Sequence, residues 1–253
     1  MKPRVLVLAL SLLLVTSCGG STAPAAPTAG STAKQTLTVF AAASLKEVFT
    51  NLGAAFQQSH PGTAVTFSFA GSQTLTAQIQ QGAPADLLAT ADAASARSVA
   101  AELVTTPTIL ARNRLAILVA PGNPLHLSGL ADLARPSLKV VLAGPTVPAG
   151  KAARSALKAA GVAVKQVSDE PDVKAVVAKV RLGEADAGIA YATDARAAKG
   201  AVVGLDLPGV SNVYPAAVLK RATHATLAAE FLAYLVSVEG QTVFQSYGFL
   251  PPA

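Results

Sequence analysis

Small residues suited to anion binding stand where predicted strands run into predicted helices. Ser44 follows three alanines at the end of the first predicted strand, and Ser72 follows the second strand in the same way. Asp172-Val173 and Gly150 open two further predicted helices. A helix N-terminus offers free backbone N–H groups and the positive end of the helix dipole, which together suit an anion. Each of these residues taken singly is an ordinary N-cap, so an anion site requires that they converge.

Signatures of catalysis are missing from the sequence. It has no Gly-x-Ser-x-Gly turn and no His-Glu-x-x-His motif, and His60, His126 and His224 lack the spacing of metal ligands. The segment 144–152 resembles a phosphate-binding loop, but it has one residue too many between its glycines. It also carries Ala152 where Ser or Thr must reach magnesium. We therefore expect a binding protein without enzymatic activity, cation site or cofactor.

The composition supports a globular domain. Apolar residues make up 51% of the chain and charged residues 13%, which excludes a wholly disordered protein. No stretch reaches the roughly 18–20 apolar residues of a membrane-spanning helix. The single cysteine excludes a disulfide framework and a cysteine-based zinc site. The net charge of +6 is spread thinly and lacks a basic patch with aromatics, so we expect no nucleic-acid partner.

The candidate residues are positioned by strands that alternate with helices. We predict strands at 37–40, 64–69, 86–90, 114–120, 138–143, 162–167, 187–192, 201–205 and 213–219. We predict helices that begin at Ser44 and Asp92 and others at 73–81, 149–160, 173–183, 226–237 and 241–247. This alternation is typical of βαβ units and mainly parallel sheets. Such sheets bind ligands at the carboxyl ends of their strands, where Ser44 and Ser72 lie.

The N-terminal residues predict export and a lipid anchor. Two basic residues precede the apolar run 5–15, which is too short to span a membrane. The segment Val15-Thr16-Ser17-Cys18 resembles a bacterial lipobox, whose cysteine is lipidated; a cleaved signal with an incidental cysteine is the alternative. We therefore read residues 1–17 as a lipoprotein signal peptide and 18–35 as a flexible tether. The protein is expected to be extracytoplasmic and lipid-anchored at the cell membrane.

Seven short segments together resemble one known family, the molybdate/tungstate-binding substrate-binding proteins of ABC importers (ModA-type). The segments are Phe40-Ala41-Ala42-Ala43-Ser44-Leu45, Phe69-Ala70-Gly71-Ser72-x-Thr74-Leu75, Gly82-Ala83-Pro84-Ala85-Asp86-Leu87, Val147-Pro148-Ala149-Gly150-Lys151, Asp172-Val173, Gly188-Ile189-Ala190-Tyr191-x-x-Asp194 and Tyr247-Gly248-Phe249. They occur in the family's order over residues 36 to 250. Each segment is weak evidence alone, but the ordered set is specific.

The resemblance implies a two-lobed α/β fold of the periplasmic-binding-protein-like type II class, with the ligand cleft between the lobes. Lobe one would comprise residues 36–112 plus 213–253, and lobe two residues 113–212, with two hinge crossings between them. The implied partners are molybdate or tungstate and the permease of an ABC importer, with the binding protein itself a monomer.

The family's oxyanion contacts carry over to five positions of this sequence. They are Ser44, Ser72, Ala149, Val173 and Tyr191. By resemblance, each serine supplies a hydroxyl and a backbone N–H, Ala149 and Val173 supply backbone N–H groups, and Tyr191 supplies its phenolic O–H. Gln73 departs from the family, because many members carry consecutive serines there. Because of this departure, the resemblance implies the position of the site more firmly than a strict preference for one oxyanion.

The residue chemistry agrees with the resemblance. A buried dianion needs a hydrogen bond to every oxygen, and a cage of neutral donors and helix ends meets that need. Such a cage rejects hydrogen phosphate, whose O–H would find no acceptor. Sulfate has the charge and shape of molybdate, so a binder of sulfate or another tetrahedral oxyanion is the alternative function. An enzyme and a ligand-sensing domain on the same scaffold are rivals from other classes. Whether Lys46, Lys151 and Lys174 steer the ligand is left open.

Overall fold

The computed structural model describes residues 35–200 and 202–252. The predicted signal peptide, the lipobox Cys18 and all of the tether except Gln35 therefore lie outside the described residues. The described residues belong to one compact unit. Among the described residues, no helix has the length and apolar character needed to cross a membrane.

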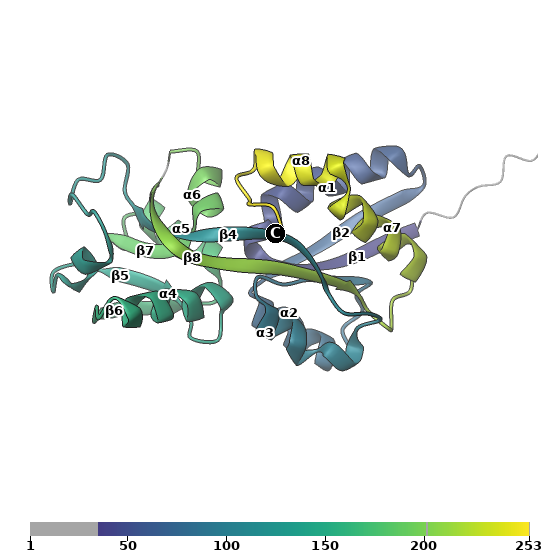
Figure 1. Ribbon diagram of the computed structural model, residues 1–253, viewed down its shortest axis with the longest axis horizontal. Helices are drawn as coiled ribbons and strands as arrows, with labels where there is room; N and C mark the ends of the chain where they lie inside the picture. The colour runs from purple at the N-terminus through teal and green to yellow at the C-terminus, as the bar shows by residue number, and fades with distance from the viewer. Residues whose placement is uncertain (1–34, 201, 253) are drawn as a thin grey trace, which may run out of the picture. The chain divides into compact units, whose positions relative to one another are not determined.

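The described residues form one mixed sheet of eight strands, flanked by helices (Figure 1). The strands are β1 (Gln35–Ala42), β2 (Thr63–Ala70), β3 (Leu87–Ala89), β4 (Thr108–Val119), β5 (Val140–Ala143), β6 (Gln166–Glu170), β7 (Ala187–Tyr191) and β8 (Val203–Val218). The α-helices are α1 (Lys46–Ser59), α2 (Ser72–Gln80), α3 (Ala93–Ser98), α4 (Pro148–Ala159), α5 (Val173–Arg181), α6 (Ala192–Ala197), α7 (Ala225–Val236) and α8 (Val238–Ser246). The strand order is β2-β1-β3-β8-β4-β7-β5-β6.

The expectation of mainly parallel sheets holds only within each half of this sheet. β1 pairs in parallel with β2 and β3, and β5 pairs in parallel with β6 and β7. The three central pairings, which all involve β4 or β8, are antiparallel. The two long strands therefore run in opposite directions and connect two parallel βαβ halves.

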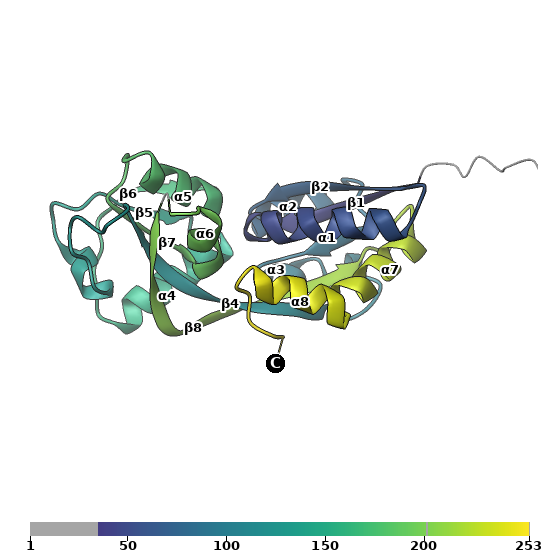
Figure 2. The same cartoon turned by 90° about the horizontal axis from the view of Figure 1, so that it is seen from above.

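The two halves form two lobes, as the type II resemblance implies (Figures 1 and 2). β1, β2 and β3 belong to one lobe with α1, α2, α3, α7 and α8, and β5, β6 and β7 belong to the other with α4, α5 and α6. The boundaries expected from the sequence fall inside the crossing strands, where Arg112 pairs with Val213 and Asn113 with Asn212. The division at these residues stays a prediction.

The strand β8 corrects the prediction of two separate strands at 201–205 and 213–219. It is one strand of 16 residues. In its pairing with β4, Ser211 lies opposite Arg114 and Asp206 lies opposite Ala116, so the register shifts between these two pairs. Pro208-Gly209 reads as a strand end in the sequence. In the structure it lies within this register shift, and the strand is continuous because β8 pairs with β4 on both sides of the shift.

Alternation along β1 shows why the first lobe has two apolar layers. Leu37, Val39 and Ala41 belong to the core beneath α1, α7 and α8, whereas Phe40 belongs to a smaller core with Leu75 of α2. Successive strand residues point to opposite faces, so a fully apolar strand is buried on both. Figure 1 shows α1, α7 and α8 on one face and α2 and α3 on the other.

Several further boundaries differ from the sequence prediction. Ser44 does not cap a helix; it lies in a 3-10 turn, Ala43–Leu45, that leads into α1. The predicted strand 162–167 is instead β6, which begins at Gln166, because the alternating segment before it forms a connection after α4. β4 begins at Thr108, six residues before the predicted 114, because its first half pairs with β8.

Candidate anion-binding site

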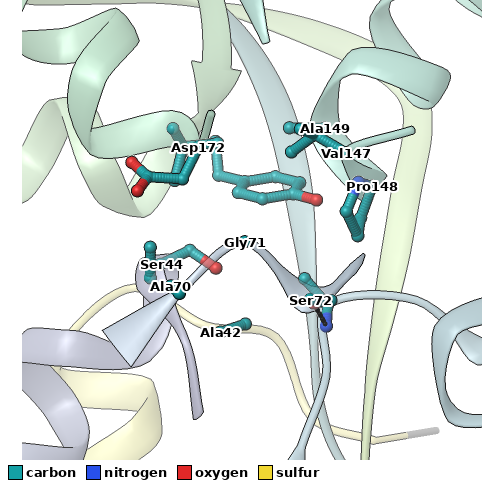
Figure 3. Close-up of a pocket in the computed structure, with 13 residues that line it drawn as sticks. Ala42, Ser44, Ala70, Gly71, Ser72, Val147, Pro148, Ala149 and Asp172 are labelled. Atoms are coloured by element: carbon teal, nitrogen blue, oxygen red, sulfur yellow. Dashed lines mark hydrogen bonds between the residues drawn. The ribbon is translucent and has the colours of Figure 1, made fainter. Parts of the chain in front are cut away.

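All five residues that the resemblance selected line one pocket. Ser44, Ser72, Ala149, Val173 and Tyr191 lie around it, and each is at most 4% exposed. Figure 3 shows Ser44, Gly71 and Ser72 on one side of the pocket and Val147, Pro148 and Ala149 on the opposite side. The structure therefore brings together residues that are up to 147 positions apart in the sequence.

The carboxyl ends of the parallel strands position these residues. β1 ends at Ala42 and leads into Ser44, and β2 ends at Ala70 and leads into Ser72. β5, β6 and β7 of the second lobe end just before or at the other three contacts. The pocket therefore lies at the edge where ligands of open α/β sheets bind, and its role as the ligand site stays a prediction.

Backbone N–H groups are left available at the helix ends around the pocket. Gly71 is the N-cap of α2 and Val147 is the N-cap of α4, and neither supplies a side-chain cap. At α5 the Asp172 carboxylate caps the N–H groups of Lys174 and Ala175, and the first N–H, that of Val173, stays outside the cap. The first N–H groups of a helix have no partner within it, so these ends can donate to an anion.

Tyr191 contributes a buried hydroxyl. Its Oη has no hydrogen-bond partner among the described residues, and the residue is only 1% exposed. Burial raises the pKa of Tyr191 well above its usual value, and the nearby Tyr214 and Asp194 raise it further. The phenol therefore stays protonated and can donate. An unpaired buried hydroxyl is costly, so this group is available to donate to an acceptor in the pocket.

The serine hydroxyls do not cap helices; they are engaged by groups behind the pocket. The backbone N–H of Ala91 donates to Ser72 Oγ over 3.0 Å. Ser44 Oγ lies 3.0 Å from the hydroxyl of Tyr214 in β8. Since Ser72 Oγ already accepts a hydrogen bond there, its own hydrogen is free to point into the pocket.

Two lysines near the pocket are paired with carboxylates. The described residues that line it include no lysine or arginine. Lys151 Nζ lies 3.6 Å from Asp92 Oδ2, and Lys174 Nζ lies 2.7 Å from Glu47 Oε2 and 2.9 Å from Asp194 Oδ1. Burial alone would lower the pKa of Lys174, but the two carboxylates raise it, so the ammonium stays charged. The sequence left open whether three lysines steer the ligand, and two of them, Lys151 and Lys174, therefore pair with carboxylates.

These ion pairs and one hydrogen bond join the two lobes beside the pocket. Glu47 and Asp92 belong to the first lobe, and their lysine partners belong to the second. Gln73 Nε2 donates to the carbonyl oxygen of Pro171 over 3.1 Å. A Cβ on Gly71 would lie 2.6 Å from that same carbonyl oxygen, so a glycine lets the lobes approach there. Gln73, the departure from the family pattern, therefore contacts the opposite lobe.

Sequence reasoning missed several residues that support the site. The Tyr214 hydroxyl contacts Ser44 from behind, Asn113 donates to Tyr214, and Asp92 pairs with Lys151. Their contacts join segments more than 50 residues apart, and no local motif marks them. The aspartate of the third family segment, Asp86, is structural, because its carboxylate accepts from the backbone N–H groups of Thr38 and His224.

The arrangement suits a small anion that is stripped of water. The cavity volume is about 10 Å³, close to the least that holds one water molecule, so this conformation of the pocket has no room for a sugar or a peptide. The donors are neutral and come from five chain segments, so they can surround a polyatomic anion. No cluster of metal-binding side chains occurs in the part of the chain that the structure describes.

Comparisons with known proteins agree with this geometry. The family described as bacterial extracellular solute-binding protein matches residues 37–250. The molybdate-binding protein ModA of Mycobacterium tuberculosis is 41% identical over 98% of this chain and 97% of its own length. The periplasmic molybdate-binding protein of Azotobacter vinelandii superposes with a TM-score of 0.75 at 21% identity, over 86% of this chain and 100% of that one. The sulfate-binding protein SubI of Mycobacterium tuberculosis has the same TM-score at 20% identity, over 86% and 87%.

Proposed function

The chain belongs to the ModA-type family of bacterial extracellular solute-binding proteins, and we propose that it captures molybdate or tungstate outside the cytoplasm for delivery to an ABC importer permease. Members of this family bind a solute and do not turn it over, so the protein is not an enzyme. In this proposal the oxyanion occupies the pocket between the lobes. Ser44, Ser72, Ala149, Val173 and Tyr191 donate to its oxygens.

One observation carries the proposal most directly: the buried hydroxyl of Tyr191 has no acceptor among the described residues and belongs to a pocket ringed by donors. Such a pocket has a deficit of acceptors, and a deprotonated oxyanion supplies acceptors only. The one carboxylate on the lining, that of Asp172, already accepts from the N–H groups of α5. The 41% identity to a molybdate-binding relative supports the choice of oxyanion.

Isothermal titration calorimetry of the purified protein with molybdate, tungstate, sulfate and phosphate tests the proposal. We expect tight binding of molybdate and tungstate and much weaker binding of sulfate, whose bonds to its central atom are shorter. Tight sulfate binding with weak molybdate binding would establish the alternative oxyanion, with which the similarity in fold to a sulfate-binding protein is compatible. Heat from none of the four anions would overturn the function.

We also propose that Cys18 anchors the protein, on the strength of the lipobox-like segment that precedes it. Replacing Cys18 with serine is expected to abolish lipidation, because serine offers no thiol for the acyl-bearing group. Fractionation should then move the protein from the membrane pellet to the soluble fraction. Mass spectrometry of the mature wild-type protein is the check on the assignment: an N-terminus without lipid would contradict it.

The ion pair between the lobes predicts a change in ligand release. The Glu47→Gln variant removes the charge facing Lys174 but keeps the shape of the side chain and leaves the Asp194 pair in place. Because Glu47 is partly exposed, the pair contributes only about 0.2–1 kcal/mol, so we expect molybdate to dissociate roughly 1.4- to fivefold faster at low salt. The difference should shrink as salt screens the pair.

Stopped-flow dissociation in a salt series measures this effect. The Asp169→Asn variant is the matched control, since its partner Arg154 lies in the same lobe. Equal acceleration in both variants would mean that the effect does not come from the contact between the lobes.

A further inference from the structure

A chain of buried polar side chains lies behind Ser44. Asn113 of β4 donates through Nδ2 to Tyr214 Oη over 3.2 Å and to Thr193 Oγ1 over 2.7 Å. The Tyr214 hydroxyl in turn lies 3.0 Å from Ser44 Oγ. Asn113 is 1% exposed, Tyr214 0% and Ser44 4%. Their hydrogen-bonding groups must therefore find partners within the protein.

The amide of Asn113 sets the direction of the hydrogen bonds at its own end of the chain. The backbone N–H of Arg114 donates to Asn113 Oδ1 over 2.9 Å, which sets the orientation of the amide and turns Nδ2 toward Tyr214. An amide nitrogen only donates, so Tyr214 Oη is the acceptor in that contact. The hydrogen of Tyr214 can then go to Ser44 Oγ, 3.0 Å away; Asn212 is the other side chain that contacts this hydroxyl. When Tyr214 donates to Ser44, the serine keeps its own hydrogen for the pocket.

We propose that Asn113 and Tyr214 are positioning residues that fix the Ser44 hydroxyl as a donor to the bound oxyanion. Neither residue lines the pocket, so both act through Ser44. The same principle holds at Ser72, where the backbone N–H of Ala91 occupies one acceptor site of Oγ. The inference rests on the proposed function, because the hydrogen of Ser44 needs an acceptor supplied by the ligand.

This orientation contributes to selectivity between oxyanions. A hydroxyl that is held as a donor binds an oxygen that carries no proton. Phosphate carries at least one proton at neutral pH, and its O–H needs an acceptor in the site. Without the hydrogen bond from Tyr214, the Ser44 hydroxyl can rotate and offer its lone pairs to such a group. Loss of Tyr214 Oη should therefore weaken the discrimination against phosphate as well as the binding of molybdate.

A double-mutant cycle with molybdate as the probe tests the inference. We expect Tyr214→Phe to weaken molybdate binding about tenfold, because the loss of one neutral hydrogen bond changes an affinity by about this factor. The ratio of molybdate to phosphate affinity should fall as well. In a Ser44→Ala background, the same change should leave the molybdate affinity almost unaltered, since no hydroxyl is left to orient. Asn113→Leu is the second variant, and it should show the same dependence on Ser44. Tyr234→Phe is the matched control, because Tyr234 lies in α7 and its hydroxyl contacts Glu239.

Each outcome of the cycle decides the question. Equal losses from Tyr214→Phe in the wild-type and Ser44→Ala backgrounds would mean that Tyr214 acts through packing, which overturns the inference and leaves the proposed function intact. Absence of molybdate binding by the wild-type protein would overturn both. Thermal unfolding of every variant identifies a loss of molybdate affinity that comes from misfolding. If one of Tyr214→Phe and Asn113→Leu is misfolded, the other decides the result.

Discussion

Molybdate binding should weaken by about ten- to more than a hundredfold when Ser72 is replaced with alanine, because a hydrogen bond to a charged acceptor contributes roughly 1.5–3 kcal/mol. The side chain is 1% exposed, and Ala91 holds its Oγ in place from behind. The hydroxyl therefore needs little reorganisation to donate. Calorimetry with molybdate measures the loss.

The same variant should also lower the stability of the unliganded protein, for a reason that the sequence did not reveal. Ser72 is the first residue of α2 and does not cap it, so no N-cap is lost. Instead, the N–H of Ala91 is left without its acceptor, which costs about 1–3 kcal/mol if no water enters. Ser246→Ala on α8 is the matched control. Unchanged molybdate affinity in Ser72→Ala, with the control also unchanged, would refute the role of this hydroxyl.

Replacing Gly150 with alanine is expected to reduce both folding stability and binding. A Cβ at this position would lie 2.1 Å from the carbonyl oxygen of Gly144 and 2.3 Å from that of Ala143. Both are backbone atoms, so the first turn of α4 must move away from the end of β5. Overpacking of this kind costs about 1–3 kcal/mol or more. The shift also displaces the N–H of Ala149, so we expect at least about tenfold weaker molybdate binding.

Thermal unfolding and calorimetry of the Gly150→Ala variant measure the two effects. Gly129→Ala is the control, because an added Cβ there meets no atom within 4 Å and its backbone is extended. A Gly150→Ala protein with the unfolding temperature and affinity of the wild type would show that α4 does not need this close approach.

The sequence selected five residues that line one pocket, but it predicted the sheet less well. These five candidate contacts were carried over by the family resemblance from short motifs at strand–helix junctions, and the carboxyl ends of β1, β2, β5, β6 and β7 bring them together. Such junctions are local features, so the sequence near each one carries the signal. Their convergence follows from the geometry of parallel sheets, in which neighbouring strands end at the same edge.

Features that depend on pairing between distant strands were not predictable in this way. The continuity of β8 through Pro208-Gly209 follows from pairing with β4, which begins about a hundred residues earlier. Ser44 looked like a helix cap because small polar residues at junctions usually are. Its actual partner, Tyr214, lies 170 positions away. Periodicity and capping preferences describe neighbours in the chain, and they carry no information about such contacts.

A crystal structure of the protein with molybdate is the most direct test of the account, because the anomalous scattering of molybdenum locates the ion. The account predicts one molybdenum atom in the pocket between the lobes. Its oxygens should lie about 3 Å from the backbone nitrogens of Ser44, Ser72, Ala149 and Val173 and from Tyr191 Oη. A molybdenum atom bound elsewhere, or held in this pocket by a different set of residues, would contradict it.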